Sequence, residues 1–136
     1  MESVWPAVAI VASDRAGTPR ATAVAIHQDG YLVTNVHAVT GSATWVKLGD
    51  RVLAAEVVAL DEGEDLALLR VPRRGMPAAK WGDSDELKAG QRVVAVGVPL
   101  GLSLAAQEGI VSSPVVRVDE RPRILLDLAV NRGNSG

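Results

Sequence analysis

Three residue types that can carry out acyl transfer together occur in this sequence as His37, Asp65 and Ser135. Ser135 lies in Gly133-Asn134-Ser135-Gly136, where small, flexible residues let successive backbone N–H groups converge beside the hydroxyl. A hydroxyl nucleophile, an imidazole base and a carboxylate that orients the base are the parts of a serine-hydrolase triad. These residues therefore predict nucleophilic catalysis by a triad in the order His, Asp, Ser.

Each member of this triad also has a simpler interpretation. Gly-Asn-Ser-Gly is typical of an ordinary turn. His37 would otherwise be a partly buried histidine bonded to a backbone carbonyl, and Asp65 a turn or capping carboxylate. Asp65 differs from the acids before it because it adjoins Leu66-Ala67-Leu68-Leu69, and a carboxylate at the edge of an apolar core needs a partner such as an imidazole N–H. The other histidine, His27, ends a strand beside a turn, where an exposed side chain is expected.

Composition limits the function classes. The 136 residues are 48% hydrophobic and 22% charged, with a formal net charge of −2, which gives no electrostatic footprint for nucleic acid. There is no cysteine, which excludes a disulfide, a thiolate nucleophile and sulfur-bound zinc. Phe is absent, so we expect a core of Val, Leu, Ile and Ala, with Trp5, Trp45 and Trp81 as packing anchors. No apolar run is long and unbroken enough to span a membrane, and no basic leader opens the chain.

The first half of the chain predicts six short strands, and regularly spaced short strands favour a small closed β-structure. Asp29-Gly30 is a tight-hairpin signal, and it places His37 on a turn or single helical turn just beyond a strand. The expected strands are residues 4–12, 21–27, 31–34, 44–48, 52–60 and 66–71.

A connector rich in Pro, Gly and charge follows, and then a second series of strands begins. We expect an N-terminal β-barrel at 1–72 with His37 and Asp65, a connector at 73–91, and the first part of a C-terminal barrel at 92–136 with Ser135. In the second series, strands are expected at 93–98 and 123–127, with one or two within 105–118. Asp83-Ser84-Asp85 lacks the remaining ligands of a calcium loop and is interpreted as a turn or cap.

Several blocks in sequence resemble the trypsin-like serine peptidases of the high-temperature-requirement A (HtrA or Deg) type. The resemblance covers nearly the whole chain, and its blocks are residues 29–39, 65–69, 82–87, 96–102, 109–113 and 127–136. It implies an all-β, trypsin-like double barrel with the active site between the barrels, no required metal or organic cofactor, and a serine endopeptidase acting on unfolded or misfolded proteins in protein quality control. Family members often work in the periplasm or elsewhere outside the cytoplasm, and often form trimers; the compartment of this chain stays open.

The resemblance also assigns roles to individual residues. Ser135 is the nucleophile, His37 the general base and acid, and Asp65 the group that orients the imidazole. The backbone N–H groups of Gly133 and Ser135 form the oxyanion hole. Ala129, Val130 and Arg132 line one wall of the specificity pocket, which favours small or medium apolar side chains before the scissile bond.

The end of the sequence adds two expectations. The family continues past the serine, so the second barrel is expected to lack its last strands and to expose an edge that can pair with another chain. A terminal carboxylate on Gly136 would repel the oxyanion by about 1 to 4 kcal/mol at about 4 Å, so the 136-residue chain alone is expected to be a poor protease. Two alternatives to the peptidase stay open, namely a non-catalytic binding module and an incomplete, inactive fragment.

Overall fold

The computed structural model describes residues 5–39, 43–98 and 105–128. Contacts within the chain divide it into two compact units. Among the described residues, unit 1 comprises residues 5–39, 43–80, 96–98 and 105, and unit 2 comprises residues 81–95 and 106–128. Within the described ranges, no helix is both long enough and apolar enough to cross a membrane. The domain boundaries predicted at residues 72 and 91 stay predictions.

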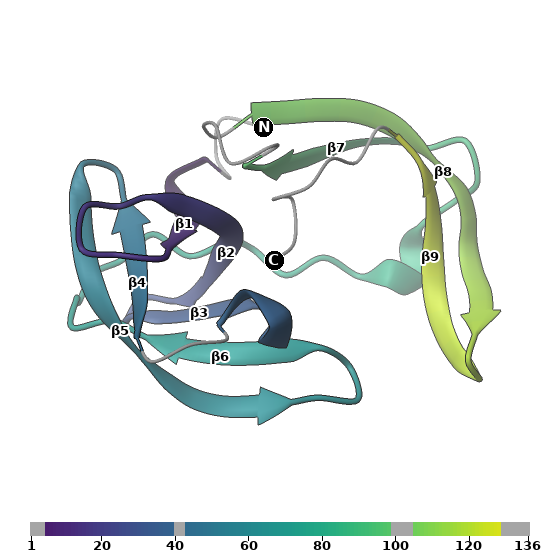
Figure 1. The fold of residues 1–136 in the computed structure, drawn as a ribbon. Helices are drawn as coiled ribbons and strands as arrows, with labels where there is room; N and C mark the ends of the chain where they lie inside the picture. Colours follow the sequence, from purple (N-terminus) through teal and green to yellow (C-terminus); the bar gives the residue numbers. More distant parts are fainter. Residues whose placement is uncertain (1–4, 40–42, 99–104, 129–136) are drawn as a thin grey trace. The chain divides into compact units, whose positions relative to one another are not determined.

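Unit 1 contains a closed antiparallel barrel, which confirms the predicted all-β class and the complete first barrel (Figure 1). The strands pair in the order β1-β2-β3-β6-β5-β4, and β4 pairs back with β1 to close the barrel. A hairpin turn at Gly30 reverses the chain where Asp29-Gly30 predicted it, and a second turn lies at Gly49; both glycines have positive φ. The strands are β1 (Val8–Ala12), β2 (Pro19–His27), β3 (Tyr31–Thr34), β4 (Thr44–Leu48), β5 (Arg51–Asp61) and β6 (Leu66–Arg70).

Small aliphatic side chains fill the interior of the barrel. Alternate residues of β4 are buried, as expected for strands with one face toward a core, whereas all of β1 is buried. Leu32, Leu69 and Met76 are the largest of the fully buried side chains in this core. In the absence of Phe, Ala, Val and Leu therefore build most of the barrel core, as the composition predicted.

A buried hydrogen-bonded pair of threonines holds part of unit 1 together. The Thr34 hydroxyl donates to the Thr22 carbonyl oxygen at 2.7 Å. The Thr22 hydroxyl in turn accepts from the backbone N–H of Val98 at 3.0 Å, so residue 98 is bonded to strand β2 although it is distant in sequence. These bonds satisfy buried polar groups between strands.

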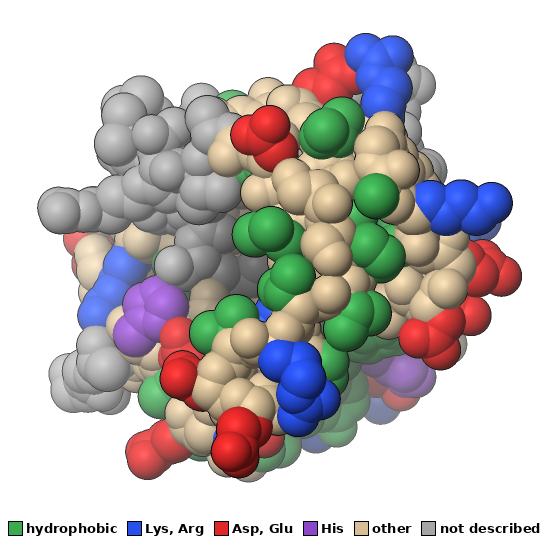
Figure 2. Space-filling view, turned by 90° about the vertical axis from the view of Figure 1, so that its right-hand side faces the viewer, with side chains coloured by type: hydrophobic (Ala, Val, Ile, Leu, Met, Phe, Trp, Pro, Cys, Tyr) green, Lys and Arg blue, Asp and Glu red, His purple; other side chains and the backbone are tan. Residues whose placement is uncertain are grey.

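The second set of strands forms a three-stranded sheet in the order β7-β8-β9, with β7 (Arg92–Gly97), β8 (Ala105–Val118) and β9 (Arg121–Asp127). Residues 105–118 form one long strand, and its register against β9 shifts on both sides of Ser113, next to Pro114, which has no N–H to donate. This sheet corresponds to the partial second barrel predicted from the sequence. Several large apolar side chains of the sheet are exposed, and Figure 2 shows such side chains across the face where β8 and β9 lie.

Two local expectations need correction. The first strand begins at Val8 and not at residue 4, because Trp5–Ala7 forms a 3-10 turn, η1, around Pro6. Trp81 is 79% exposed, so its prediction as a packing anchor is wrong. By contrast, Asp83 caps the turn η3 (Ser84–Glu86) by accepting from the Asp85 N–H at 3.0 Å, as predicted.

Candidate active site

The register of two barrel strands brings His37 and Asp65 together. Strands β3 and β6 are antiparallel, and Thr34, the last residue of β3, pairs with Ala67 near the start of β6. The chain that leaves β3 and the chain that enters β6 therefore meet at the same end of the barrel. His37 follows β3 by three residues and Asp65 directly precedes β6, so residues separated by 28 positions become neighbours.

His37 lies on the single 3-10 turn η2 (Val36–Ala38), as the sequence predicted. The Ala38 N–H bonds to the Asn35 carbonyl at 3.1 Å, and the Val39 N–H bonds to the Val36 carbonyl at 3.1 Å. Ala38 is buried in the barrel core, whereas His37 is exposed. The small, buried alanine anchors the turn and directs the imidazole away from the core.

Asp65 ends the acidic loop in a left-handed backbone conformation, with φ of 56°. Few residues other than glycine adopt this region, although Asp and Asn do so more readily than most. The loop before it is closed locally, because the Glu64 N–H bonds to the Asp61 carboxylate at 3.1 Å and the Asp65 N–H to the Glu62 carbonyl at 3.3 Å. This geometry presents the Asp65 side chain to the η2 turn.

The two side chains are in direct contact. Asp65 Oδ2 lies 2.6 Å from His37 Nδ1, and Asp65 Oδ1 accepts from the His37 backbone N–H at 3.2 Å. Partial desolvation raises the pKa of Asp65, but the hydrogen bonds from the His37 ring and backbone N–H and the ring's charge together outweigh it, and the pKa lies below the ordinary 3.8. Asp65 is therefore ionised at neutral pH.

An ionised carboxylate only accepts hydrogen bonds, so Nδ1 of His37 must carry the proton in this contact. In the neutral ring, Nε2 is then the basic nitrogen. The side chains of His37 and Asp65 are 58% and 45% exposed, and exposed pairs contribute little to folding. Chemically, the pair is an imidazole held in one tautomer and one orientation, ready to accept a proton at Nε2.

Asn35 takes part in this arrangement and was missed at the level of the sequence. Its side-chain Nδ2 donates to the Asp65 carbonyl oxygen at 2.7 Å, and it does not cap the η2 turn that it precedes. The Val36 N–H reaches the same carbonyl at 3.4 Å. The sequence does show an asparagine immediately before the turn that carries the base. Its partner could not be identified, because the contact depends on the strand register.

The remaining predicted site residues lie outside the described residues. These are the nucleophile Ser135, the oxyanion-hole residue Gly133, and the pocket-wall residues Ala129, Val130 and Arg132. Among the residues that the structure does describe, no group of three or more His, Asp or Glu side chains is placed to hold a metal ion.

Comparison with known proteins identifies relatives of this chain. Residues 21–136 match the family model described as "Trypsin-like peptidase domain". A protein of Halomonas elongata named "Probable periplasmic serine endoprotease DegP-like" is 43% identical over 117 residues, which are 82% of this chain and 24% of that protein. The magnetosome formation protease MamE of Paramagnetospirillum magneticum is 37% identical over 126 residues, 85% of this chain and 17% of its own.

A solved structure of the HtrA-type protease AlgW with a tripeptide is also similar. It superposes with a TM-score of 0.89 at 32% sequence identity, over 99% of this chain and 47% of that one. The chain thus spans about a quarter or less of the curated relatives' length and about half of the solved chain.

Proposed function

We propose, because this chain belongs to the trypsin-like peptidase domain family, that it carries the serine-endopeptidase chemistry of that family on His37, Asp65 and Ser135. The observation that supports this most directly is the 2.6 Å contact between His37 Nδ1 and Asp65 Oδ2. It supplies two of the three groups that the reaction needs, in the tautomer that the reaction needs.

In the proposed reaction, Ser135 Oγ attacks the peptide carbonyl carbon while His37 Nε2 accepts the hydroxyl proton. The same nitrogen then returns the proton to the leaving amine, and an activated water hydrolyses the acyl-enzyme. Asp65 stabilises the imidazolium in both steps. The N–H groups of Gly133 and Ser135 stabilise the oxyanion, and one such donor is worth about 3 kcal/mol. Ala129, Val130 and Arg132 would select the side chain before the cut.

The substrates are proposed to be polypeptides in an extended or unfolded form. Solved relatives carry a tripeptide or a decapeptide, the Halomonas elongata relative is named as an endoprotease, and MamE is named as a protease. The Halomonas elongata relative is also named as periplasmic, which supports an extracytoplasmic site of action.

A matched pair of histidine variants tests the proposal. Labelling by a fluorophosphonate and cleavage of casein are measured for Ser135→Ala, His37→Ala and His27→Ala, with circular dichroism as the check on folding. We expect Ser135→Ala to abolish labelling, His37→Ala to slow it by about 10⁴-fold or more, and His27→Ala to leave it unchanged. Labelling that persists in Ser135→Ala, or equal rates for the two histidine variants, would contradict the mechanism.

A further inference from the structure

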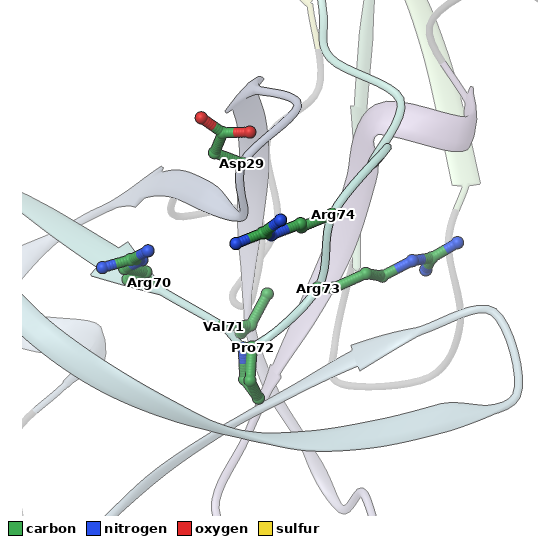
Figure 3. Close-up of a pocket in the computed structure, with 6 residues that line it drawn as sticks. All are labelled: Asp29, Arg70, Val71, Pro72, Arg73 and Arg74. Atoms are coloured by element: carbon green, nitrogen blue, oxygen red, sulfur yellow. The ribbon is translucent and has the colours of Figure 1, made fainter.

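A cavity lies at the end of the barrel opposite His37 and Asp65. The pairing of β3 with β6 places Thr34 and Ala67 at the end near the catalytic pair, and Tyr31 and Arg70 at the other end. Beyond Arg70 the structure has an open cavity of about 500 Å³, shown in Figure 3. Its lining residues are Asp29, Arg70, Val71, Pro72, Arg73 and Arg74.

The residues that line this cavity carry a net positive charge, although Glu56 on β5 pairs in register with Arg70 on β6. Three arginines and one aspartate line it, so three positive charges and one negative charge give a formal net charge of +2. Among the described residues, no carboxylate forms an ion pair with Arg70, Arg73 or Arg74, and Asp29 instead lies 3.7 Å from His27. Arg74 extends toward Arg70 across the cavity, whereas Arg73 extends the other way (Figure 3).

The two segments that form the walls are tied to each other by backbone hydrogen bonds. The Val71 N–H donates to the Gly30 carbonyl at 2.9 Å, and the Met76 N–H donates to the Gln28 carbonyl at 3.0 Å. A further bond from the Arg73 N–H to the Val71 carbonyl at 2.8 Å tightens the segment that follows β6. Val71 and Met76 are buried, so the backbone that carries the arginines is fixed before any ligand binds.

The Arg70 side chain is positioned without losing its charge. Its guanidinium carbon lies 5.3 Å from the centre of the Tyr31 ring, a cation–π contact that orients the group but leaves its N–H donors available. A guanidinium presents its donors as a planar fork that matches the oxygens of a carboxylate or phosphate. Arg70 and Arg74 each offer such a fork at this cavity.

We propose that this cavity binds a phosphate dianion through Arg70 and Arg74. The ligand is either inorganic phosphate or the phosphate of a small phosphomonoester. The dianion matches the net charge of the lining, which a single carboxylate does not. The volume falls within the range of small-molecule sites and exceeds that of a phosphate group, so it has room for an ester substituent beside Pro72.

Calorimetric titration of the full chain tests this site. Inorganic phosphate and glycerol 3-phosphate are titrated separately at constant ionic strength, set with sodium chloride. Arg74→Gln is expected to weaken the binding of either ligand by about tenfold or more, the value of one charged hydrogen-bonding group, and Arg70→Gln with Arg74→Gln to abolish it. Arg51→Gln, at an exposed arginine that begins β5, removes the same charge and is expected to change binding less than about twofold.

A lysine variant at position 74 and the comparison of the two ligands complete the test. Arg70 packs on Tyr31, so its replacement can affect folding; Arg74 is exposed, and Arg74→Lys retains the charge but removes the fork. Lysine at 74 is expected to bind more weakly than arginine and more tightly than glutamine. Tighter binding of glycerol 3-phosphate than of phosphate identifies a monoester as the ligand, and the reverse identifies free phosphate. Absence of measurable binding at millimolar ligand, or equal weakening by Arg51→Gln, overturns the proposal.

Discussion

Asp65 contacts the candidate base through both of its carboxylate oxygens, and Asn35 holds the backbone of Asp65. One carboxylate oxygen contacts the His37 ring, the other accepts from the His37 backbone N–H, and the Asp65 carbonyl accepts from Asn35. The imidazole is thus oriented relative to its own turn as well as to the carboxylate. A proton acceptor whose position is fixed in this way needs no rearrangement before the reaction.

Replacing Asp65 by asparagine removes the charge and keeps the shape. An amide can donate to Nδ1, which favours the tautomer with the proton on Nε2, so the base is blocked. We expect the second-order rate of fluorophosphonate labelling to fall by about 10⁴-fold. Asp50→Asn, in the β4–β5 turn, is the matched control and should label at the rate of the unmodified chain. If the labelling rate of Asp65→Asn fell by less than about tenfold, the Asp65 carboxylate would not be the group that orients His37.

Asn35 is predicted to be a positioning residue. Asn35→Ala removes the 2.7 Å bond to the Asp65 carbonyl and frees a residue held at positive φ. We expect peptide hydrolysis to lose about 10- to 100-fold in kcat with KM little changed, because alignment is lost and binding is not. Unfolding in urea should show a loss of about 1 kcal/mol from the missing hydrogen bond. A rise in KM with constant kcat would instead assign Asn35 to substrate binding.

Among the elements, the turn between β1 and β2 makes stability depend on pH. The Thr18 hydroxyl donates to Asp14 at 2.6 Å and the Thr18 N–H donates at 3.0 Å, and these bonds lower the pKa of Asp14 from the ordinary 3.8. A carboxyl with a lowered folded-state pKa stabilises the fold above its unfolded pKa, and this contribution is lost as the pH falls through the folded pKa.

Thr18→Val tests this turn, with Thr18→Ser as the control that keeps the hydroxyl. The valine variant should be less stable than the unmodified chain in urea at about pH 6, and the difference should shrink as the pH falls below about 3.8. The serine variant should follow the unmodified chain at both pH values. A stability difference that is independent of pH would show that lost packing, and not the Asp14 carboxylate, is responsible.

The β2–β3 hairpin depends on a close approach that only glycine allows. Gly30 has φ of 97°, and a Cβ placed there would overlap the Val71 carbonyl oxygen. Gly49, in the β4–β5 hairpin, also has positive φ, at 58°, but has no atom within 4 Å of such a Cβ. Gly30→Ala should therefore cost more than Gly49→Ala, for which backbone strain alone predicts about 1 to 2 kcal/mol. Equal midpoints of urea unfolding would contradict this.

These elements also show what could be predicted from the sequence. Strand positions and hairpins followed from apolar alternation and from Asp29-Gly30, because both signals are local. The partner of Asp65 could be named from chemical need and from the family resemblance, but its position could not, and the partner of Asn35 could not be named at all, since both contacts depend on the register of β3 against β6. Trp81 was misjudged because hydrophobicity alone does not say whether an anchor has a core to enter. The arginine cavity likewise joins a hairpin and a connector that are far apart in the sequence.

At the scale of the whole molecule, apolar burial is distributed unevenly between the two units. The core cluster lies in unit 1, whereas Val111 is the one buried apolar side chain among the described residues of unit 2. In the β7–β8–β9 sheet, large apolar side chains are instead 40% to 63% exposed. They are Val94, Ile110, Val115, Val118, Ile124, Leu125 and Leu126. Since burial is the main source of stability, the two units should open with different free energies.

Native-state hydrogen exchange measures this difference directly. Amides of β3 and β6, which flank the fully buried Leu32 and Leu69, should exchange only with opening of the barrel. Amides paired between β8 and β9 should exchange faster by about 10³-fold or more, because a local opening of that sheet exposes little further apolar surface. Ala substitution at Leu69 should speed exchange in the barrel while leaving the β8–β9 amides unchanged. Equal protection in both sheets, or acceleration of both by that substitution, would mean that the units unfold as one.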